Sequence, residues 1–256
     1  MSDACYVYCV IASGRRPRPT RVARGLPATG PVRVLDARGG LHVVVADAPL
    51  SEYGEAAIAR GLANLEWVSR AAMAHERVVE SFGKADAVLP MKLFTMFSNE
   101  ARALAHVSEQ RKRIDALVRR VTGHDEWSVR VVLDRARAER AAPKSATASD
   151  GRTGVAYLAQ KKARRDAARE LAERAQETVA DLYDRLSARA REATRRTASE
   201  LPAQGGSLLL DAAFLIPRRR AASFKTLAGR EAKALARHGY GVTLTGPWPP
   251  YSFVQD

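Results

Sequence analysis

Apolar residues gather in short runs along the chain, and several of these runs have the composition of strands. The run 5–12 (CYVYCVIA) is rich in β-branched and aromatic residues and predicts a strand. Residues 31–49 predict a hairpin, because two apolar runs flank Gly39 and Gly40, which can supply the positive φ of a tight turn. The same reasoning predicts further strands at 126–133, 205–217 and 240–246.

Other segments repeat apolar residues at the spacing of a helix. We expect a helix over 64–82, with Asn64 as its N-cap and Gly83 as its stop. Its apolar stripe consists of Leu65, Val68, Ala72 and Val79, flanked by Ala71, Ala74 and Val78. Further helices are predicted over 98–122 and within 218–239.

The longest helical pattern covers residues 155–199. Its stripe is formed by Leu171, Ala175, Val179, Leu182, Leu186, Ala190 and Ala193. An unbroken helix of this length would span about 65 Å, so we expect a kink or a break. Residues 135–152 are small and polar and predict a surface loop, whereas 86–97 predicts a buried strand, or a strand and a loop, interrupted at Pro90.

The order of these elements predicts an α+β protein of two domains. Residues 1–124 combine a small sheet with helices. Residues 125–246 have the strand–helix–strand, helix–strand rhythm of a split βαβ unit, which predicts a ferredoxin-like domain with a long helix. The remaining residues, 247–256, predict an extended tail.

The tail combines prolines with the aromatic residues Trp248, Tyr251 and Phe253. Prolines hold the backbone extended, and each aromatic side chain can bury roughly 150–250 Å². We expect the tail to lie back across the body of the protein and to bridge its two domains. The alternative is a polyproline ligand for the aromatic groove of another protein.

The chain of 256 residues has a formal net charge of +14, which favours acidic partners. Its basic clusters at 15–24, 111–120, 160–165 and 218–220 are spread along the sequence and lack interleaved aromatic residues for base stacking. Each cluster is either a solvated face or a surface for an acidic partner. No segment has the apolar length of a membrane span or the pattern of a signal peptide, so we expect a cytoplasmic protein.

The sequence offers no convincing catalytic constellation. His75 and Glu76 begin an H-E-x-x-H pattern, but Val79 occupies the second histidine position, so a packing histidine is the simpler interpretation. Residues 124–126 (HDE) form either a weak cation site or a solvated turn, and 151–154 (GRTG) either bind an anion or lead the chain into the long helix. We therefore expect no catalytic, cofactor-binding or metal-binding residues, no cofactor and no enzymatic activity.

The two cysteines, Cys5 and Cys9, lie in one predicted strand, four residues apart and on one face. Their Cα atoms would be about 13 Å apart, which is too far for a disulfide. We expect two buried free thiols.

Several segments occur in an order that resembles the gas vesicle accessory proteins of the GvpF/GvpL family. The matching stretches are YVYCVI, LEWVSRAAMAHERVVE, AVLPMKLFTMFS, HDEWSVRVVLD, RTGVAYLAQKK, DAAFLIPRR and GYGVTLTGPWPPYSFV. They cover nearly the whole chain. The chain departs from the family at Phe94, where the resemblance leads us to expect a glycine, and this leaves open whether the stretch keeps the family's backbone.

The resemblance implies a fold of two α+β domains, the second ferredoxin-like, and a non-enzymatic, structural or chaperone-like role in gas vesicle assembly. The implied partners are the small, hydrophobic shell protein and other gas vesicle accessory proteins, with no specific nucleic acid and no membrane. The implied location is the gas vesicle. The alternative from another class is a basic module that binds nucleic acid, and its binding would fall steeply with salt.

Overall fold

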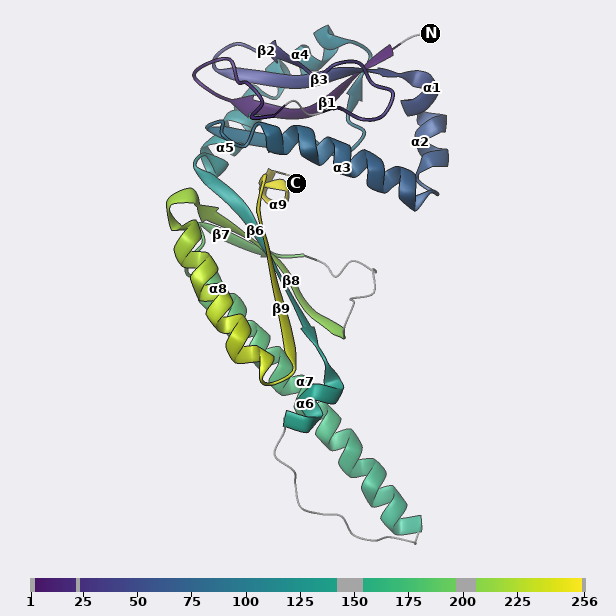
Figure 1. Ribbon diagram of the computed structural model, residues 1–256, viewed down its shortest axis with the longest axis vertical. Coiled ribbons are helices and arrows are strands. Elements are labelled where there is room, and N and C mark those ends of the chain that lie inside the picture. The colour runs from purple at the N-terminus through teal and green to yellow at the C-terminus, as the bar shows by residue number, and fades with distance from the viewer. Residues whose placement is uncertain (1–2, 22–23, 142–153, 197–205, 255–256) are drawn as a thin grey trace. The chain divides into compact units, whose positions relative to one another are not determined.

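A computed structural model describes residues 3–21, 24–141, 154–196 and 206–254 of the chain (Figure 1). It has a mixed fold of helices and two antiparallel sheets. The chain divides into two compact units, which we call unit 1 (1–126 together with 247–256) and unit 2 (127–246). Each unit is considered by itself.

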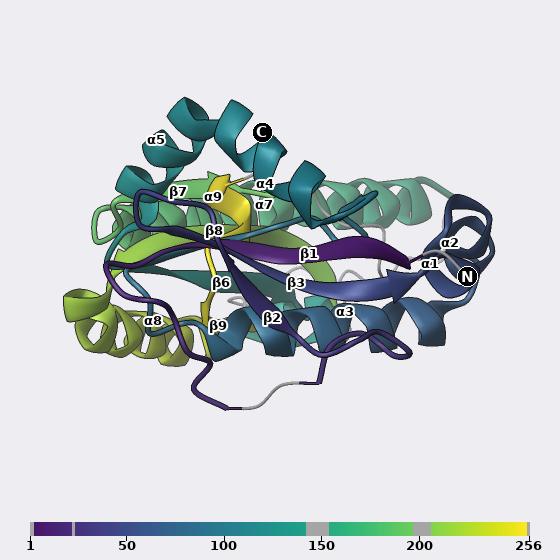
Figure 2. The same cartoon turned by 90° about the horizontal axis from the view of Figure 1, so that it is seen from above.

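Unit 1 contains a five-stranded sheet with the order β2-β3-β1-β4, in which β5 also pairs with β1. Its elements are β1 (Asp3–Ala12), β2 (Arg33–Asp36), β3 (Leu41–Pro49), α1 (Leu50–Tyr53), α2 (Glu55–Gly61), α3 (Leu65–Ser81), β4 (Ala87–Pro90), β5 (Met96–Phe97), α4 (Glu100–Glu109), α5 (Arg111–Val121) and α9 (Tyr251–Val254). Helix α3 runs along one face of the sheet (Figures 1 and 2). Helix α5 packs against β4.

The predicted strand and hairpin at the start of the chain are β1, β2 and β3, and Gly39 and Gly40 have φ of 56° and 75° in the turn. Both cysteines are buried and free. They do not lie on one face of β1, because a β-bulge between Val7 and Cys9 shifts the register by one residue. Cys9 consequently joins the core cluster beneath α3.

Helix α3 begins as expected, since the Asn64 side chain accepts a hydrogen bond from the Trp67 backbone N–H (3.1 Å). Its buried side is rotated relative to the predicted stripe, because Leu65 is 76% exposed. The residues of α3 that are buried are Ala71, Ala74, His75, Val78, Val79 and Ser81. These side chains pack against the tyrosines and small residues of β1 and β3.

The single helix predicted over 98–122 is in fact two helices, α4 and α5, which are separated at Gln110. Asn99 caps α4 by accepting a hydrogen bond from the Arg102 N–H (3.0 Å). Gly123 follows the second helix with a φ of 71°, which glycine adopts without the strain of a side chain.

Unit 2 contains a four-stranded sheet with the order β7-β8-β6-β9. Its elements are β6 (His124–Leu133), which begins in unit 1, α6 (Arg135–Ala141), α7 (Gly154–Ser187), β7 (Glu192–Arg195), β8 (Ser207–Pro217), the 3₁₀ turn η1 (Arg218–Arg220), α8 (Ala221–Ala236) and β9 (Tyr240–Trp248). Helices α7 and α8 bury one face of the sheet around a core that includes Leu182, Phe214 and Phe224.

Three predictions for this part of the chain are wrong. The long helix α7 ends at Ser187, twelve residues before the predicted end at 199. The chain then forms the edge strand β7 from Glu192. The apolar residues keep helical spacing as far as Ala193, but Ala193 lies in strand β7 and packs against the core from there. The surface loop predicted from residue 135 begins with helix α6, while 142–153 lies outside the described residues.

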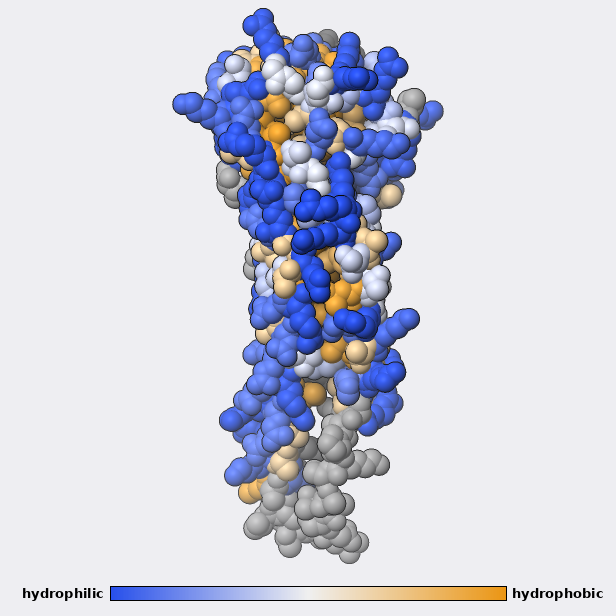
Figure 3. Space-filling view, turned by 90° about the vertical axis from the view of Figure 1, so that its left-hand side faces the viewer, coloured by the Kyte–Doolittle hydropathy of each residue, from blue (hydrophilic) through white to orange (hydrophobic). Residues whose placement is uncertain are grey.

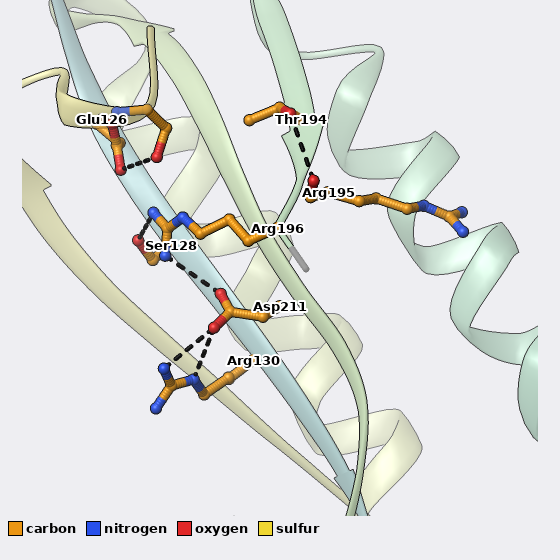
Figure 4. A network of polar contacts seen from close by, with 8 residues as sticks. Glu126, Ser128, Arg130, Thr194, Arg195, Arg196 and Asp211 are labelled. Atoms are coloured by element: carbon orange, nitrogen blue, oxygen red, sulfur yellow. Dashed lines mark hydrogen bonds and ion pairs between the residues drawn. The ribbon is translucent and has the colours of Figure 1, made fainter. Parts of the chain in front are cut away.

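The opposite face of this sheet carries a polar network around Asp211, which is 7% exposed (Figure 4). Arg130 donates two hydrogen bonds to one carboxylate oxygen (3.1 and 3.0 Å), and Arg196 donates one to the other (3.2 Å). Arg196 also donates to the Ser128 hydroxyl (2.8 Å). Two guanidinium groups thus neutralise one buried carboxylate and connect β6, β8 and the residue that follows β7.

The tail is extended only in part. Strand β9 continues to Trp248, and residues Tyr251–Val254 form the short helix α9. Pro249 and Pro250 precede this turn, where a missing backbone N–H costs nothing. Among the described residues, no helix has both the length and the apolar character that a bilayer span requires.

Candidate functional site

The most unusual backbone of unit 1 lies between β4 and β5. Both strands pair with β1, and hydrogen bonds to β1 mark where the chain leaves the ladder and where it returns: Met91 N–H donates to the Tyr8 carbonyl (2.9 Å), and Val7 N–H donates to the Thr95 carbonyl (2.9 Å). The residues between them therefore project from the sheet edge. This is the strand and loop interrupted near Pro90 that the sequence predicted.

Phe94 occupies the left-handed region with a φ of 65°. The backbone at this position therefore has the positive φ that a glycine would allow, although the residue carries a large side chain. Left-handed backbone costs a non-glycine residue about 1–2 kcal/mol. The ring offsets this cost by stacking on Trp67 (centroids 5.1 Å apart) and packing near Tyr53 (6.3 Å), and the Phe94 N–H donates to the Tyr6 hydroxyl (3.2 Å).

Two substitutions separate the backbone strain from the packing of the ring. Phe94→Ala removes the ring and keeps the strain, whereas Phe94→Gly removes both. We expect the free energy of unfolding to fall in the order wild type, Phe94→Gly, Phe94→Ala, with about 1 kcal/mol between the two variants. Urea denaturation measures this order. An alanine variant as stable as the glycine variant would show that the backbone here is not strained.

The projecting segment forms one wall of an apolar groove against α2. Its volume is about 770 Å³, and it is lined by Glu55, Ile58, Ala59, Leu62, Leu93, Phe94 and Met96. Among the described residues that line it, Glu55 alone is charged. Leu62 is 59% exposed, and the neighbouring Leu65 is 76% exposed. Exposed apolar side chains gathered at a groove make it a candidate surface for a partner.

A second groove lies between α3 and the loop that precedes β2. It has a volume of about 940 Å³ and combines apolar side chains such as Leu26, Val32 and Phe82 with the guanidinium groups of Arg24, Arg70 and Arg77. An apolar surface with a cationic border favours a segment that carries both apolar and acidic residues.

Beneath the projecting segment, two tyrosines and a histidine form a buried cluster. The Tyr6 ring lies 4.7 Å from Tyr8 and 5.8 Å from His75, and its hydroxyl is 2.7 Å from His75 Nδ1. Burial lowers the pKa of His75 to about 4, although the nearby Met91 carbonyl acts in the opposite direction. Burial also raises the pKa of Tyr6. Both groups are therefore neutral at neutral pH.

The tail meets unit 1 through a buried carboxylate. Glu126, which is 2% exposed, accepts hydrogen bonds from the Ser252 N–H (2.7 Å) and the Ser252 hydroxyl (3.0 Å). Phe253 is 1% exposed, and the Arg120 guanidinium lies 6.0 Å from its ring centre. Helix α9 packs against β4 and α5.

The residues that the sequence singled out are distributed as follows. His75 and Val79 are both buried on α3, and no group of metal ligands is found within the described residues. Residues 124–126 (HDE) do not form a turn but begin strand β6. His124 Nδ1 contacts the Thr122 carbonyl (2.7 Å), while Glu126 holds the tail, a role that sequence reasoning missed. In the GRTG stretch, only Gly154 belongs to the described residues.

Part of the basic surface serves the fold. Arg111 donates to the carbonyls of Arg38 and Gly39 in the hairpin turn. Arg33 donates to both carboxylate oxygens of Asp47 (2.7 and 2.6 Å) and to Glu100, and its guanidinium lowers the pKa of Asp47. On the face shown in Figure 3, hydrophilic side chains predominate, with hydrophobic ones in short stretches between them.

The comparison with protein families decides the assignment. A family model described as gas vesicle synthesis protein GvpL/GvpF matches residues 4–255. The chain belongs to the GvpL/GvpF family. This family consists of gas vesicle structural and assembly proteins, it is not known for enzymatic activity, and membership assigns the chain to gas vesicle formation.

Individual GvpL/GvpF proteins agree with this assignment. The chain is 28% identical to gas vesicle protein L of Streptomyces sp. (strain CB03234), over 97% of this chain and 92% of the relative. It is 26% identical to gas vesicle protein F of the same strain, over 98% and 99%.

Solved GvpF structures have the same fold. The crystal structure of GvpF from Anabaena sp. PCC7120 matches with a TM-score of 0.71 at 18% identity, over 100% of this chain and 97% of that one. GvpF from Microcystis aeruginosa matches with a TM-score of 0.67 at 17% identity, over 98% and 99%.

Proposed function

We propose that this protein binds the hydrophobic shell protein of gas vesicles while the vesicle forms, as a non-enzymatic, chaperone-like or structural component. The observation that carries the proposal is the apolar groove between α2 and residues 93–96, in whose described lining Glu55 is the one charged residue. A shell subunit with an apolar face requires cover before it polymerises, because exposed apolar surface associates without specificity. The exposed side chains of Leu62 and Leu65 provide such cover at low cost.

The second groove supports the same proposal by adding charge. Its three arginines suit acidic positions on a shell subunit or on another accessory protein. The protein would accordingly act at the gas vesicle, with shell and accessory proteins as its partners. Specific nucleic acid and membrane are not among the proposed partners.

The proposal includes the domain organisation expected from the sequence: domains at 1–124 and 125–246, the second ferredoxin-like, with the tail docked on the body. The strand order β7-β8-β6-β9, with α7 after the first strand and α8 after the third, supports a ferredoxin-like second domain. The contacts of Ser252 and Phe253 support the docked tail. An experimental structure of this chain is the check.

The test is co-purification of the protein with the shell protein after Leu62→Asp, which places a charge at the apolar groove. We expect the amount of shell protein retained to fall at least tenfold, because a buried unpaired charge opposes docking. Leu158→Asp is the matched control, since Leu158 is 63% exposed on α7 of unit 2. Undiminished retention by Leu62→Asp would contradict the proposal.

Salt separates this function from nucleic-acid binding. Apolar docking to the shell protein is expected to persist from low to moderate salt, whereas binding through phosphate contacts falls by orders of magnitude over that range. Retention that collapses at moderate salt would contradict an apolar interface.

A further inference from the structure

The second groove, between α3 and the loop that precedes β2, runs along the helix. The residues of α3 that line it follow one another at alternating spacings of three and one, so they form a single face of the helix. They are Arg70, Met73, Ala74, Arg77, Val78 and Ser81. From Arg70 to Ser81 this face extends about 17 Å along the helix axis. The groove is therefore elongated and has room for a length of polypeptide chain.

The volume of the second groove favours an extended chain over a helix. A volume of about 940 Å³ spread over that length leaves a cross-section of roughly 55 Å². A helix with its side chains is about 10 Å across and needs about 80 Å². An extended chain is thinner, and about five residues of it cover the length of the groove.

Strand β2 gives the second groove a free backbone edge. It is the outermost strand of the order β2-β3-β1-β4 (Figure 2), and Val32 and Val34 line the groove. The Ala37 N–H donates to the Leu41 carbonyl (2.9 Å), so Ala37 turns its N–H towards the partner strand of the hairpin. Alternate residues of a strand point their backbone groups the same way, and Val34 lies three positions before Ala37. The N–H and C=O groups of Val34 therefore point away from β3.

This edge is only partly occupied. The Arg16 guanidinium donates to the Val34 carbonyl (3.0 Å), which confirms that the carbonyl faces outward. The Val34 N–H has no hydrogen-bond partner among the described residues. A strand edge with an unpaired N–H, placed beside a groove for side chains, is the arrangement that strand addition uses.

The charge of the second groove specifies the kind of segment that fits it. Arg24, Arg70 and Arg77 line it, and none of its described lining residues carries a carboxylate. Met73, which is 58% exposed, adds an apolar contact between two of the arginines. Phe82 is the one aromatic residue of the described lining, and at 2% exposure it cannot stack on a base. These features favour a polypeptide with acidic and apolar residues over a nucleic acid.

We propose that the second groove binds an extended segment of a partner polypeptide, which adds to β2 as a strand and carries acidic residues on both sides of apolar ones. The backbone of this segment pairs with Val34 and displaces the Arg16 guanidinium from the carbonyl. Its apolar side chains contact Met73 and Val78, and its carboxylates meet the three arginines. The inference rests on the proposed function for the assignment of the partner to the gas vesicle proteins.

The test titrates the whole protein with the peptide acetyl-Glu-Leu-Val-Leu-Glu-amide and follows the Val34 amide proton by NMR. We expect a saturable downfield shift, because this N–H gains a hydrogen bond. The same peptide with glutamine in place of both glutamates is expected to bind at least tenfold more weakly, and the version with lysine more weakly still. The absence of a saturable shift, or equal affinity of the three peptides, would overturn the proposal.

Methylation of the peptide backbone separates strand addition from the docking of side chains alone. One version of the acidic peptide is N-methylated on alternate amides, and a second version on the remaining ones. We expect their affinities to differ at least tenfold, because alternate N–H groups of a paired strand face the same neighbour. Equal affinity of the two versions would refute strand addition.

Variants connect the binding to the arginines. The double variant Arg70→Gln with Arg77→Gln is expected to weaken binding of the acidic peptide at least tenfold. Arg102→Gln with Arg119→Gln, at exposed positions of α4 and α5, is the matched control, because it lowers the net charge equally. Amide resonances that are unchanged away from the groove show that the variants fold. Wild-type affinity in the first double variant would contradict the proposal.

Two further results separate this site from its alternatives. Displacement of the peptide by an equal concentration of a ten-nucleotide oligothymidylate would assign the groove to nucleic acid and overturn the proposal. The peptide assay contains no shell protein, so its failure overturns this site alone. Undiminished retention of the shell protein by Leu62→Asp, in contrast, contradicts the proposed function and leaves the peptide result standing, because Leu62 does not line the second groove.

Discussion

Replacing Phe253 by alanine is expected to lower the free energy of unfolding by about 3–5 kcal/mol, the usual cost of removing a buried aromatic side chain. The ring is 1% exposed, and helix α9 packs against β4 and α5 of unit 1. Its removal would leave a cavity where the tail joins the core. Urea denaturation, with the slope compared between variants, measures the loss.

A matched control for this experiment is Leu62→Ala, which removes an apolar side chain that is 59% exposed. We expect a change within about 0.5 kcal/mol there. Deleting residues 247–256 should destabilise unit 1 at least as much as Phe253→Ala, because it also removes two hydrogen bonds that Ser252 donates to buried Glu126. An unchanged melting point after this deletion would show that the tail does not dock.

Acid is expected to destabilise the protein through His75. The pKa of this histidine is about 4 in the folded state against an ordinary 6.5, so the unfolded chain binds the extra proton first. The stability that depends on neutral His75 is complete above about pH 6.5 and is lost as the pH falls towards 4. The difference in pKa corresponds to about 3 kcal/mol.

The contribution of His75 is isolated by comparing the wild type with His75→Gln, which cannot titrate. Glu76 acts in the opposite direction, since burial raises its pKa and its protonation favours the folded state at low pH. We expect the wild type to lose about 3 kcal/mol more than the variant between pH 6.5 and 4, measured by urea unfolding at each pH. His238→Gln, at an exposed position, should follow the wild type. Parallel curves for the wild type and His75→Gln would contradict a neutral buried histidine.

Elements with strong local signals were predictable from the sequence. The run 5–12, the glycine turn of the first hairpin and the cap at Asn64 each lie where local chemistry placed them. In such segments, secondary-structure propensity, hydrophobic pattern and turn chemistry all favour the same structure, and tertiary packing favours it too.

Elements whose form is set by distant contacts were not predictable. Strand β7 has the sequence EATR, without apolar alternation, and it is a strand because β8 offers an edge to pair with. Phe94 adopts a glycine-like backbone because Trp67 and Tyr6 hold its ring and its N–H. Local sequence contains neither partner.

The residues of the candidate site likewise include some that the sequence singled out and some whose roles depend on distant contacts. The sequence drew attention to the His75-Glu76 pair and to the aromatic tail, but it could not show that Tyr251 lines the same pocket as both. The role of Glu126 was also hidden, since Ser252 lies 126 positions further along the chain.

Because unit 1 takes in residues from both ends of the chain, its maturation is tied to translation. A ribosome synthesises all of residues 127–246 before α9 emerges, so the nascent N-terminal sheet must wait, with the site for Phe253 unfilled and Glu126 without Ser252. A polypeptide that ends before residue 247 lacks the C-terminal part of unit 1. A molecule whose unit 1 is complete has therefore been synthesised at least as far as Val254.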